Sequence, residues 1–157
     1  MNNRKNIRLD KESYLGERAY SITACTNARK ALLLRGEFYT DFVSILRETI
    51  GRDFDVYVYT VMPDHFHGLF VDKTEAANLG KSMKLFKQKT GFLYKKIFNE
   101  ALWQRDYYDH VLRKEDSLEA VALYILYNPV EAGLSKNPFD YPYSGSFVYD
   151  DLRVLHP

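Results

Sequence analysis

The fold is decided by the stretch Val61-Met62-Pro63-Asp64-His65-Phe66-His67-Gly68-Leu69-Phe70, which predicts the turn and the return strand of a β-hairpin. Residues 54–61, which precede the turn, are rich in β-branched and aromatic side chains, as strands are. Residues 62–64 supply the turn, because a proline suits this position. Residues 65–71 then form the returning strand.

Two of the four histidines in the chain, His65 and His67, lie on this returning strand. Side chains alternate across a strand, so the two imidazoles share one face while Phe66 points to the other. Two imidazoles side by side on a rigid sheet form a metal-binding edge, or half of one. His-x-His pairs also arise by chance in aromatic-rich strands, so on this motif alone a structural role remains open.

Length and composition indicate one globular domain over residues 1–157, with a flexible arm at 1–17 and a tail at 148–157. A chain of 157 residues can bury a sizeable core, and 46% apolar residues exclude a disordered chain. The single cysteine, Cys25, allows no internal disulfide and no cysteine-based zinc site. No apolar run approaches the roughly 18 residues of a membrane span, and no apolar segment typical of a signal peptide follows the first residues. We therefore expect a cytoplasmic protein.

Charge is unevenly distributed along the chain. A net charge of +1 argues against nucleic-acid binding, but nine basic residues and only three acidic ones lie between Lys81 and Lys114. Such clustering makes an electrostatic footprint for phosphates, although a solvated helix face is the common alternative. The basic residues are Lys81, Lys84, Lys87, Lys89, Lys95, Lys96, Arg105, Arg113 and Lys114.

Hydrophobic periodicity predicts a first strand at 18–26, helices at 37–50, 75–98 and 115–128, and an aromatic strand at 102–113. We expect Gly51 to end the first helix, and Pro129 to end the last one at Asn128. Together with the hairpin, this order indicates a ferredoxin-like α+β sandwich with a central antiparallel sheet and one added C-terminal helix. The candidate buried stripe of the longest helix is Leu79, Met83, Phe86, Leu93 and Ile97, and Thr90-Gly91 is a possible bend.

The last predicted helix carries a second pair of polar residues. Tyr124 and Asn128 are four residues apart, so they stack on one helix face among apolar neighbours. They would meet the two histidines if this helix lay across the sheet. Taken alone, they favour the ordinary interpretation, in which Tyr124 belongs to the core and Asn128 caps the helix.

Three motifs together resemble a known family. They are Pro63-Asp64-His65-Phe66-His67, then Leu102-Trp103-Gln104-Arg105 with Tyr108-Asp109-His110, and finally Tyr124-Ile125 followed by residues 128–134. In this order and spacing they resemble the REP-associated tyrosine transposases, which belong to the wider HUH (His-hydrophobic-His), IS200-like single-strand transposases. The resemblance runs from about residue 18 to residue 147. It departs from the family at Glu131, where a basic residue is usual, and at residues 144–146, where a tighter serine pair is usual.

The resemblance implies a sequence-specific single-strand DNA nicking and joining enzyme. His65 and His67 would hold Mg²⁺ or Mn²⁺ with Asn128 as the third ligand, and Tyr124 would form a covalent phosphotyrosine intermediate. Such a shell leaves positions open for phosphate oxygens, and the cation would act as a Lewis acid. A phenol is a weak nucleophile near neutral pH, so the site must help to expose the phenolate.

The expected partner is single-stranded or hairpin DNA, without any membrane, and the protein is expected to be a monomer or a homodimer. Lys84, Lys87, Arg105 and Arg113 are candidates for contacts with the DNA backbone. The aromatic candidates for stacking on bases are Phe66, Trp103, Tyr107 and Tyr108, and core packing is the alternative for each. His110 matches a family position without an assigned role.

Three other functions remain open. A domesticated, non-transposing relative that binds DNA hairpins would keep the basic segment but could lose the metal or the tyrosine. An RNA-binding module would show paired aromatic residues with characteristic glycines, which are not found. A metal-dependent hydrolase would need another carboxylate or histidine near His65 and His67, and we expect the neighbouring Asp64 to face away from them.

Overall fold

The computed structural model describes residues 18–113 and 115–155, so the expected arm at 1–17, Lys114 and His156 lie outside the described residues. The single domain over the whole chain therefore stays a prediction. In the described part, no helix is long and apolar enough to cross a membrane. The elements are β1 (Ala19–Cys25), the 3-10 helix η1 (Asn27–Arg29), α1 (Phe38–Glu48), α2 (Ile50–Asp53), β2 (Phe54–Val61), β3 (His65–Asp72), α3 (Leu79–Phe98), β4 (Tyr108–Val111), α4 (Leu118–Glu131), η2 (Pro138–Asp140), β5 (Ser144–Gly145) and η3 (Leu152–Leu155).

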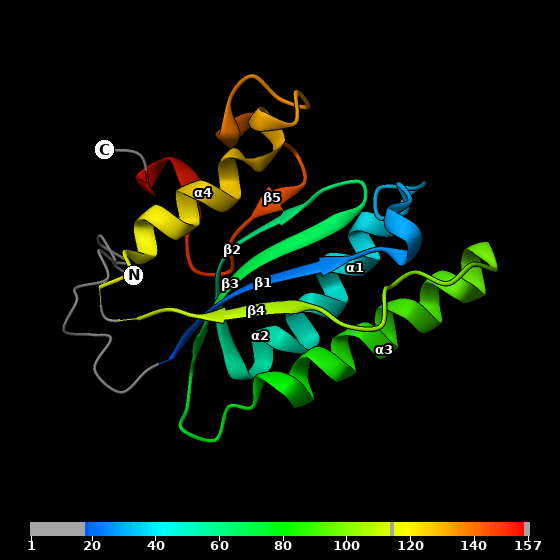
Figure 1. The fold of residues 1–157 in the computed structure, drawn as a ribbon, viewed down its shortest axis with the longest axis horizontal. Coiled ribbons are helices and arrows are strands. Elements are labelled where there is room, and N and C mark those ends of the chain that lie inside the picture. The colour runs from blue at the N-terminus through cyan, green and yellow to red at the C-terminus, as the bar shows by residue number, and fades with distance from the viewer. Residues whose placement is uncertain (1–17, 114, 156–157) are drawn as a thin grey trace.

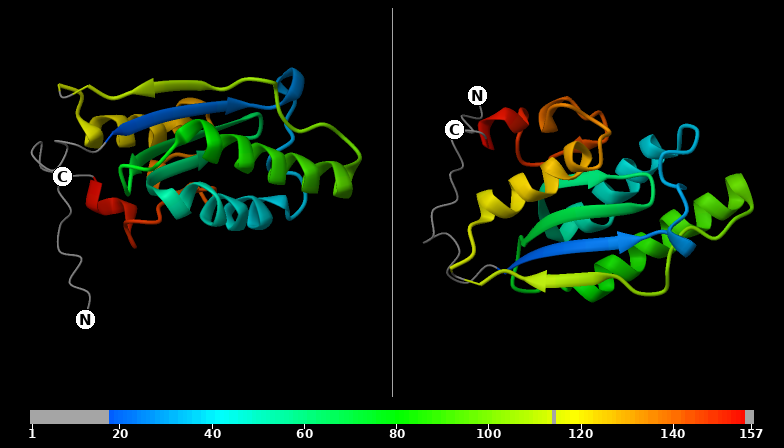
Figure 2. Two further views of the ribbon diagram at one scale, coloured as in Figure 1. Left: turned by 90° about the horizontal axis from the view of Figure 1, so that it is seen from below. Right: turned by 45° about the horizontal axis from the view of Figure 1, so that its top comes forward.

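The strands form one antiparallel sheet in the order β4-β1-β3-β2-β5. The first four strands in this order have the arrangement of a ferredoxin-like sandwich, which confirms the predicted fold class. Helices α1, α2 and α3 cover one face of the sheet, while α4 lies across the other face (Figures 1 and 2). The sheet is therefore enclosed by two layers, and the predicted added helix forms the second one.

Strand β3 contributes to both layers because its side chains alternate. Phe66 and Phe70 are fully buried against α1 and α3, where Phe42 meets Phe66 edge-to-face at a ring-centroid distance of 5.1 Å. On the opposite face, Leu69 and Val71 pack under α4. This alternation turns the side chains at positions 65 and 67 toward the α4 side, as predicted. It also shows that Phe66 cannot stack on a DNA base, because its ring is fully buried.

Gly68 lies between these two phenylalanines and is required by their packing. A Cβ atom at this position would lie 2.5 Å from the ring of Phe70 and 3.3 Å from the ring of Phe66. Without it, the two rings close over the strand at a centroid distance of 6.3 Å. Close backbone approach is thus the physical reason for a glycine within a buried strand.

Several predicted boundaries were wrong. Gly51 does not end the first helix, because α1 ends at Glu48 with Thr49 as its C-cap, and Gly51 lies inside the short α2. α3 begins only at Leu79, after the Asn78 side chain accepts a hydrogen bond from the backbone of Lys81. It continues without a break through Thr90, whose hydroxyl donates to the carbonyl of Phe86.

The exposed and buried sides of α3 also differ from the prediction near its end. Leu79, Met83 and Phe86 are buried as expected, but Ile97 is half exposed and Tyr94 is buried in its place. The predicted strand at 102–113 shrinks to β4, because Trp103 forms only an isolated bridge with Thr26.

α4 continues through Pro129 to Glu131, so the prediction that it ends at Asn128 was wrong. Proline removes a single backbone donor, and the ladder resumes when the amide of Ala132 donates to Asn128 at 3.0 Å. Part of the expected tail at 148–157 is also packed, since Val148 and Leu155 are buried in the cluster under α4. These contacts hold α4 on the sheet and place Asn128 inside a rigid helix.

Candidate metal centre and tyrosine helix

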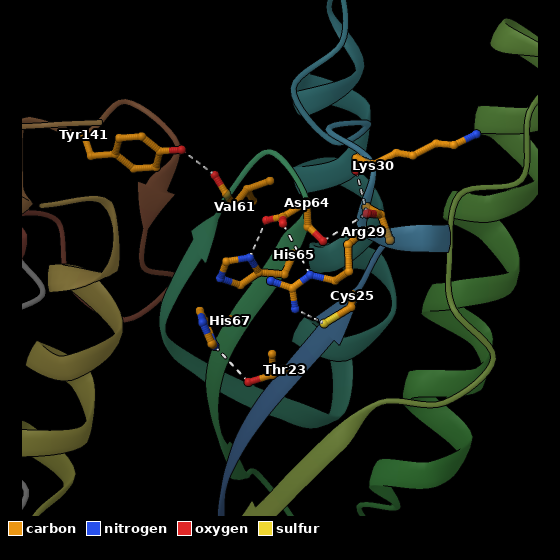
Figure 3. Close-up of polar contacts among 10 residues, drawn as sticks. Thr23, Cys25, Arg29, Lys30, Val61, Asp64, His65, His67 and Tyr141 are labelled. Atoms are coloured by element: carbon orange, nitrogen blue, oxygen red, sulfur yellow. Dashed lines mark hydrogen bonds and ion pairs between the residues drawn. The ribbon is translucent and has the colours of Figure 1, made fainter. Parts of the chain in front are cut away.

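His65 and His67 stand side by side at the start of β3, with ring centroids 4.7 Å apart and planes at 87° (Figure 3). The preceding turn is held by the amide of Met62, which donates to the carbonyl of His65 at 2.8 Å. Both imidazoles are therefore carried by a hydrogen-bonded hairpin whose other face is packed into the core. This is the rigid placement that a metal ligand pair needs.

Each imidazole has its Nδ1 atom engaged by another side chain. Asp64 Oδ1 lies 2.7 Å from Nδ1 of His65, and Thr23 Oγ1 lies 2.9 Å from Nδ1 of His67. If Nδ1 carries the proton in both rings, Nε2 of each is left as a lone-pair donor. This is the usual arrangement around metal-binding histidines, in which an outer partner selects the tautomer.

The expectation that Asp64 faces away from the histidines was wrong. Asp64 belongs to the turn and precedes β3, so the alternation of the strand does not govern its direction. Its second oxygen lies 3.3 Å from Nε of Arg29. Burial would raise the pKa of Asp64, but the hydrogen bond and charge of His65 together with the charge of Arg29 hold it below its usual value.

Asn128 reaches the same place from α4, the helix that covers the face of the sheet where the two histidines lie. α4 packs across β2 and β3, and the side chain of Asn128 lies near enough to His67 to raise the pKa of its imidazole. One turn earlier on the helix, Tyr124 exposes 63% of its surface, and its carbonyl accepts a hydrogen bond from Asn128 Nδ2 at 3.3 Å. The helix therefore presents an exposed phenol within one turn of the residue that lies near His67.

His67 is held in its neutral form. Burial, followed by the charges of His65 and Arg29, lowers its pKa to about 4, although the Asn128 side chain and the backbone of Ile22 oppose this shift. Neutral imidazole is the form that binds a cation. His67 is thus available as a ligand over the whole physiological pH range.

A divalent cation fits this donor set. The residues that could hold it are His65 and His67 through Nε2 and Asn128 through its amide oxygen, which leave further coordination positions for oxygen ligands of a substrate. Within residues 18–113 and 115–155 no group of three histidine, cysteine, aspartate or glutamate side chains could hold a metal. Among the described residues, the amide oxygen of Asn128 is thus the candidate for a third protein ligand.

A row of polar side chains crosses the sheet through His67. Thr23 pairs with His67 on one side and with Tyr108 on the other, while Thr60 pairs with His67 and with Ser144. Directly paired residues share a face of the sheet, so this row lies on the α4 side. Tyr108 forms its outer end and exposes 75% of its surface. An exposed ring two strands from the histidines is a suitable stacking surface for an unpaired base.

The structure does not bring the predicted DNA-contact residues together with the histidines. Lys84 is exposed on α3, in the opposite layer. Lys87 donates to the carbonyls of Gln104 and Arg105 at 2.8 and 3.0 Å, and burial lowers its pKa. Trp103 is half-buried and donates to the hydroxyl of Thr90 at 2.8 Å.

The remaining candidates lie near the β4 edge of the sheet. Arg105 and Arg113 are exposed, and Tyr107 is half-buried. His110 is exposed on β4. Within the described residues its partner is Asp116, whose Oδ2 lies 3.6 Å from Nε2 of His110, and this contact is a structural one. DNA contact by any of these side chains stays a prediction.

Sequence reasoning missed Thr23 and Arg29. Thr23 lies 44 positions before His67, and Arg29 lies 35 positions before Asp64. Only the strand register and the path of the chain after β1 reveal these contacts. The one usable signal was the alternation of β1, which places Thr23 on one face with Ser21.

The fold, the histidine pair and the helix that carries Tyr124 agree with the family that the sequence motifs resemble. The chain belongs to the family of IS200-like transposases, whose family model, described as "Transposase IS200 like", matches residues 16–128. The match includes the hairpin, β4 and α4 as far as Asn128.

A sequence relative agrees with this membership, and a solved structure agrees with the fold. A REP-associated tyrosine transposase of Escherichia coli (strain K12) is 24% identical over 148 residues, which cover 92% of this chain and 85% of that protein. Among solved structures, a REP-associated tyrosine transposase bound to a REP hairpin matches with a TM-score of 0.65 at 20% identity. That match covers 81% of this chain and 75% of the other. The resemblance inferred from the motifs is thus confirmed.

Proposed function

We propose that this protein cuts and rejoins single-stranded DNA through a phosphotyrosine formed at Tyr124, with a divalent cation held by His65, His67 and Asn128. The observation that carries the proposal is the packing of α4 across β2 and β3, which brings Asn128 near His67. It connects the helix with the exposed tyrosine to the strand with the histidine pair. Family membership supports a DNA-processing activity.

Side chains of this protein supply the nucleophile and orient the two imidazoles. The Tyr124 oxygen attacks phosphorus and loses its proton, while the bond from phosphorus to one deoxyribose oxygen breaks and that oxygen leaves as a hydroxyl. A second strand end reverses the step, so rejoining needs no ATP. Thr23 and Asp64 orient the two imidazoles through Nδ1. Mg²⁺ or Mn²⁺, when bound, supplies Lewis-acid stabilisation of charge on the phosphate.

The proposed substrate is a DNA hairpin with a single-stranded flank. The support is a structural relative that was solved bound to a REP hairpin. On this chain, Tyr108 offers an exposed ring near the site for a base of the flank. Location in the cytoplasm and the choice between monomer and homodimer stay predictions.

The direct test is cleavage of a labelled hairpin oligonucleotide by Tyr124→Phe. This variant should lose cleavage and keep binding, because only the hydroxyl is removed. Tyr127→Phe is the matched control, since it removes a hydroxyl from the same helix three residues away, and it should cleave as the wild type does. Cleavage by Tyr124→Phe at the wild-type rate would overturn the assignment of the nucleophile.

The metal site has its own test. His65→Ala and His67→Ala should each lose Mn²⁺ binding in calorimetry and metal-dependent cleavage. Asn128→Ala should lose less, because an amide oxygen is a weaker ligand that water can replace. Equal Mn²⁺ affinity in the wild type and His67→Ala would remove the metal from the proposal. Hairpin binding without any cleavage by the wild type would favour the domesticated, non-transposing relative.

A further inference from the structure

We infer that Arg29 is a positioning residue of this site, which acts on His65 through Asp64. The inference rests on the proposed function and adds a residue outside the three family motifs. Arg29 lies in η1, directly after β1, and its guanidinium reaches back to the turn of the hairpin (Figure 3). Its role would be to fix the carboxylate that selects the tautomer of the imidazole.

The contacts form a continuous chain. Arg29 Nε lies 3.3 Å from one oxygen of Asp64, and the other oxygen lies 2.7 Å from His65 Nδ1. The guanidinium is anchored a second time, because its Nη1 donates to the sulfur of buried Cys25 at 3.0 Å. Both oxygens of Asp64 are thus engaged, and the guanidinium of Arg29 contacts both Asp64 and Cys25. This geometry leaves the carboxylate one orientation toward the imidazole.

The backbone that carries Arg29 is unusual. Ala28 and Arg29 both adopt left-handed conformations, with φ of 53° and 56°, which residues other than glycine rarely do. Such strain persists only where the surrounding structure imposes it, and it gathers at functional sites. A surface arginine in an ordinary ion pair would not need such a left-handed backbone.

The surrounding structure does impose this conformation. Buried Thr26 donates through its hydroxyl to the carbonyl of Lys30 at 2.6 Å, and its amide donates to the carbonyl of Asp64 at 2.9 Å. The amide of Asn27 donates to Leu102 at 2.8 Å. The segment that carries Arg29 is therefore hydrogen-bonded to the backbone of Asp64, which fixes the position of Arg29 relative to that carboxylate.

Loss of the guanidinium would free the carboxylate. The Asp64 side chain is one-third exposed, so without Arg29 it can turn to water, whereas His65 is largely buried and keeps an Nδ1 atom that needs a partner. The imidazole would then populate both tautomers, and only one of them offers Nε2 to a cation. Outer partners of this kind contribute roughly 10–100-fold to metal affinity.

The experiment measures the tautomer and the metal affinity separately. Long-range ¹H–¹⁵N correlation spectra of the metal-free protein report which nitrogen of His65 carries the proton, and calorimetry with Mn²⁺ reports the affinity. In the wild type the proton should be on Nδ1. Arg29→Ala should show mixed tautomers and roughly 10–100-fold weaker Mn²⁺ binding. Arg29→Lys should recover part of both, because an ammonium keeps the charge without the second nitrogen.

Arg52→Ala is the matched control. Arg52 is also exposed and forms an ion pair of 3.6 Å with Asp53 in α2, near the end of β2 remote from the histidines. The control should leave the tautomer and the affinity unchanged. If Arg29→Ala does not fold, Arg29→Gln tests the same contact, because it removes the charge and keeps most of the side chain, with the same mixed tautomers expected.

Wild-type tautomer and wild-type affinity in folded Arg29→Ala would overturn the inference. Failure of the proposed function has a different signature. In that case the wild type itself does not bind Mn²⁺, or binds it equally well after His67→Ala, while the spectra of the metal-free protein still decide whether Arg29 controls the tautomer.

Discussion

Acid should destabilise this protein through His67 in particular. The imidazole is half-buried, and this burial, together with the charges of His65 and Arg29, lowers its pKa from 6.5 to about 4. Between these two pH values the unfolded chain holds a proton on this side chain and the folded chain does not. Stability that is fully present above pH 6.5 is therefore lost as the pH falls toward 4.

The size of the effect follows from the shift. Each pH unit between 6.5 and 4 costs about 1.4 kcal/mol, so His67 alone removes about 3 kcal/mol from the free energy of unfolding. This is a large share of the roughly 5–15 kcal/mol that stabilises an ordinary domain.

The assay is urea unfolding with a chelator present, at pH 7 and at pH 4, for the wild type and for His67→Gln. Other titrating groups contribute equally to both proteins and cancel in the comparison. The wild type should lose about 3 kcal/mol more than the variant between the two pH values. His110→Gln, which removes an exposed imidazole, is the matched control and should behave as the wild type. Equal losses in the wild type and His67→Gln would refute the reasoning.

Four further predictions concern DNA binding, packing and stability. Tyr108→Ala should weaken binding of a single-stranded flank by about 1–3 kcal/mol in fluorescence anisotropy, whereas Tyr108→Phe should bind as the wild type does, since stacking uses the ring. Gly68→Ala should lower the free energy of unfolding by about 1–3 kcal/mol in urea titrations, because a Cβ atom would collide with Phe70; an unchanged midpoint would contradict this packing. Lys84→Gln should reduce the salt dependence of binding by about 0.7 log units per log unit of salt if it contacts one phosphate, and an unchanged slope would leave it a solvated surface residue. Lys87→Gln should instead lower thermal stability, because it removes hydrogen bonds to two carbonyls of the loop after α3.

The sheet and the histidine pair could be predicted because their signals are local. The two-residue period of a strand puts His65 and His67 on one face and Phe66 on the other, whatever the rest of the chain does. Helix ends were less predictable. Pro129 and Gly51 look like stops, yet α4 continues through Pro129 and α2 includes Gly51, so the preference of a single residue does not set the helix end.

The partners of the histidines could not be predicted. Thr23 meets His67 only because β1 and β3 pair in one particular register, and nothing local to either strand sets it. Arg29 reaches Asp64 through two left-handed residues that are not glycines, so no turn signal marks them. The meeting of Asn128 with His67 depended on α4 crossing the sheet, which the apolar residues of this helix allow but do not specify.

The central claim is that Tyr124 becomes covalently joined to DNA. The most direct measurement incubates the wild type with a hairpin oligonucleotide and Mn²⁺, digests the complex, and locates the nucleotide adduct by tandem mass spectrometry. The account predicts a phosphodiester on Tyr124, with fragment ions that exclude Tyr127, and no adduct for Tyr124→Phe. An adduct on another residue, or cleavage of the strand without any adduct, would contradict it.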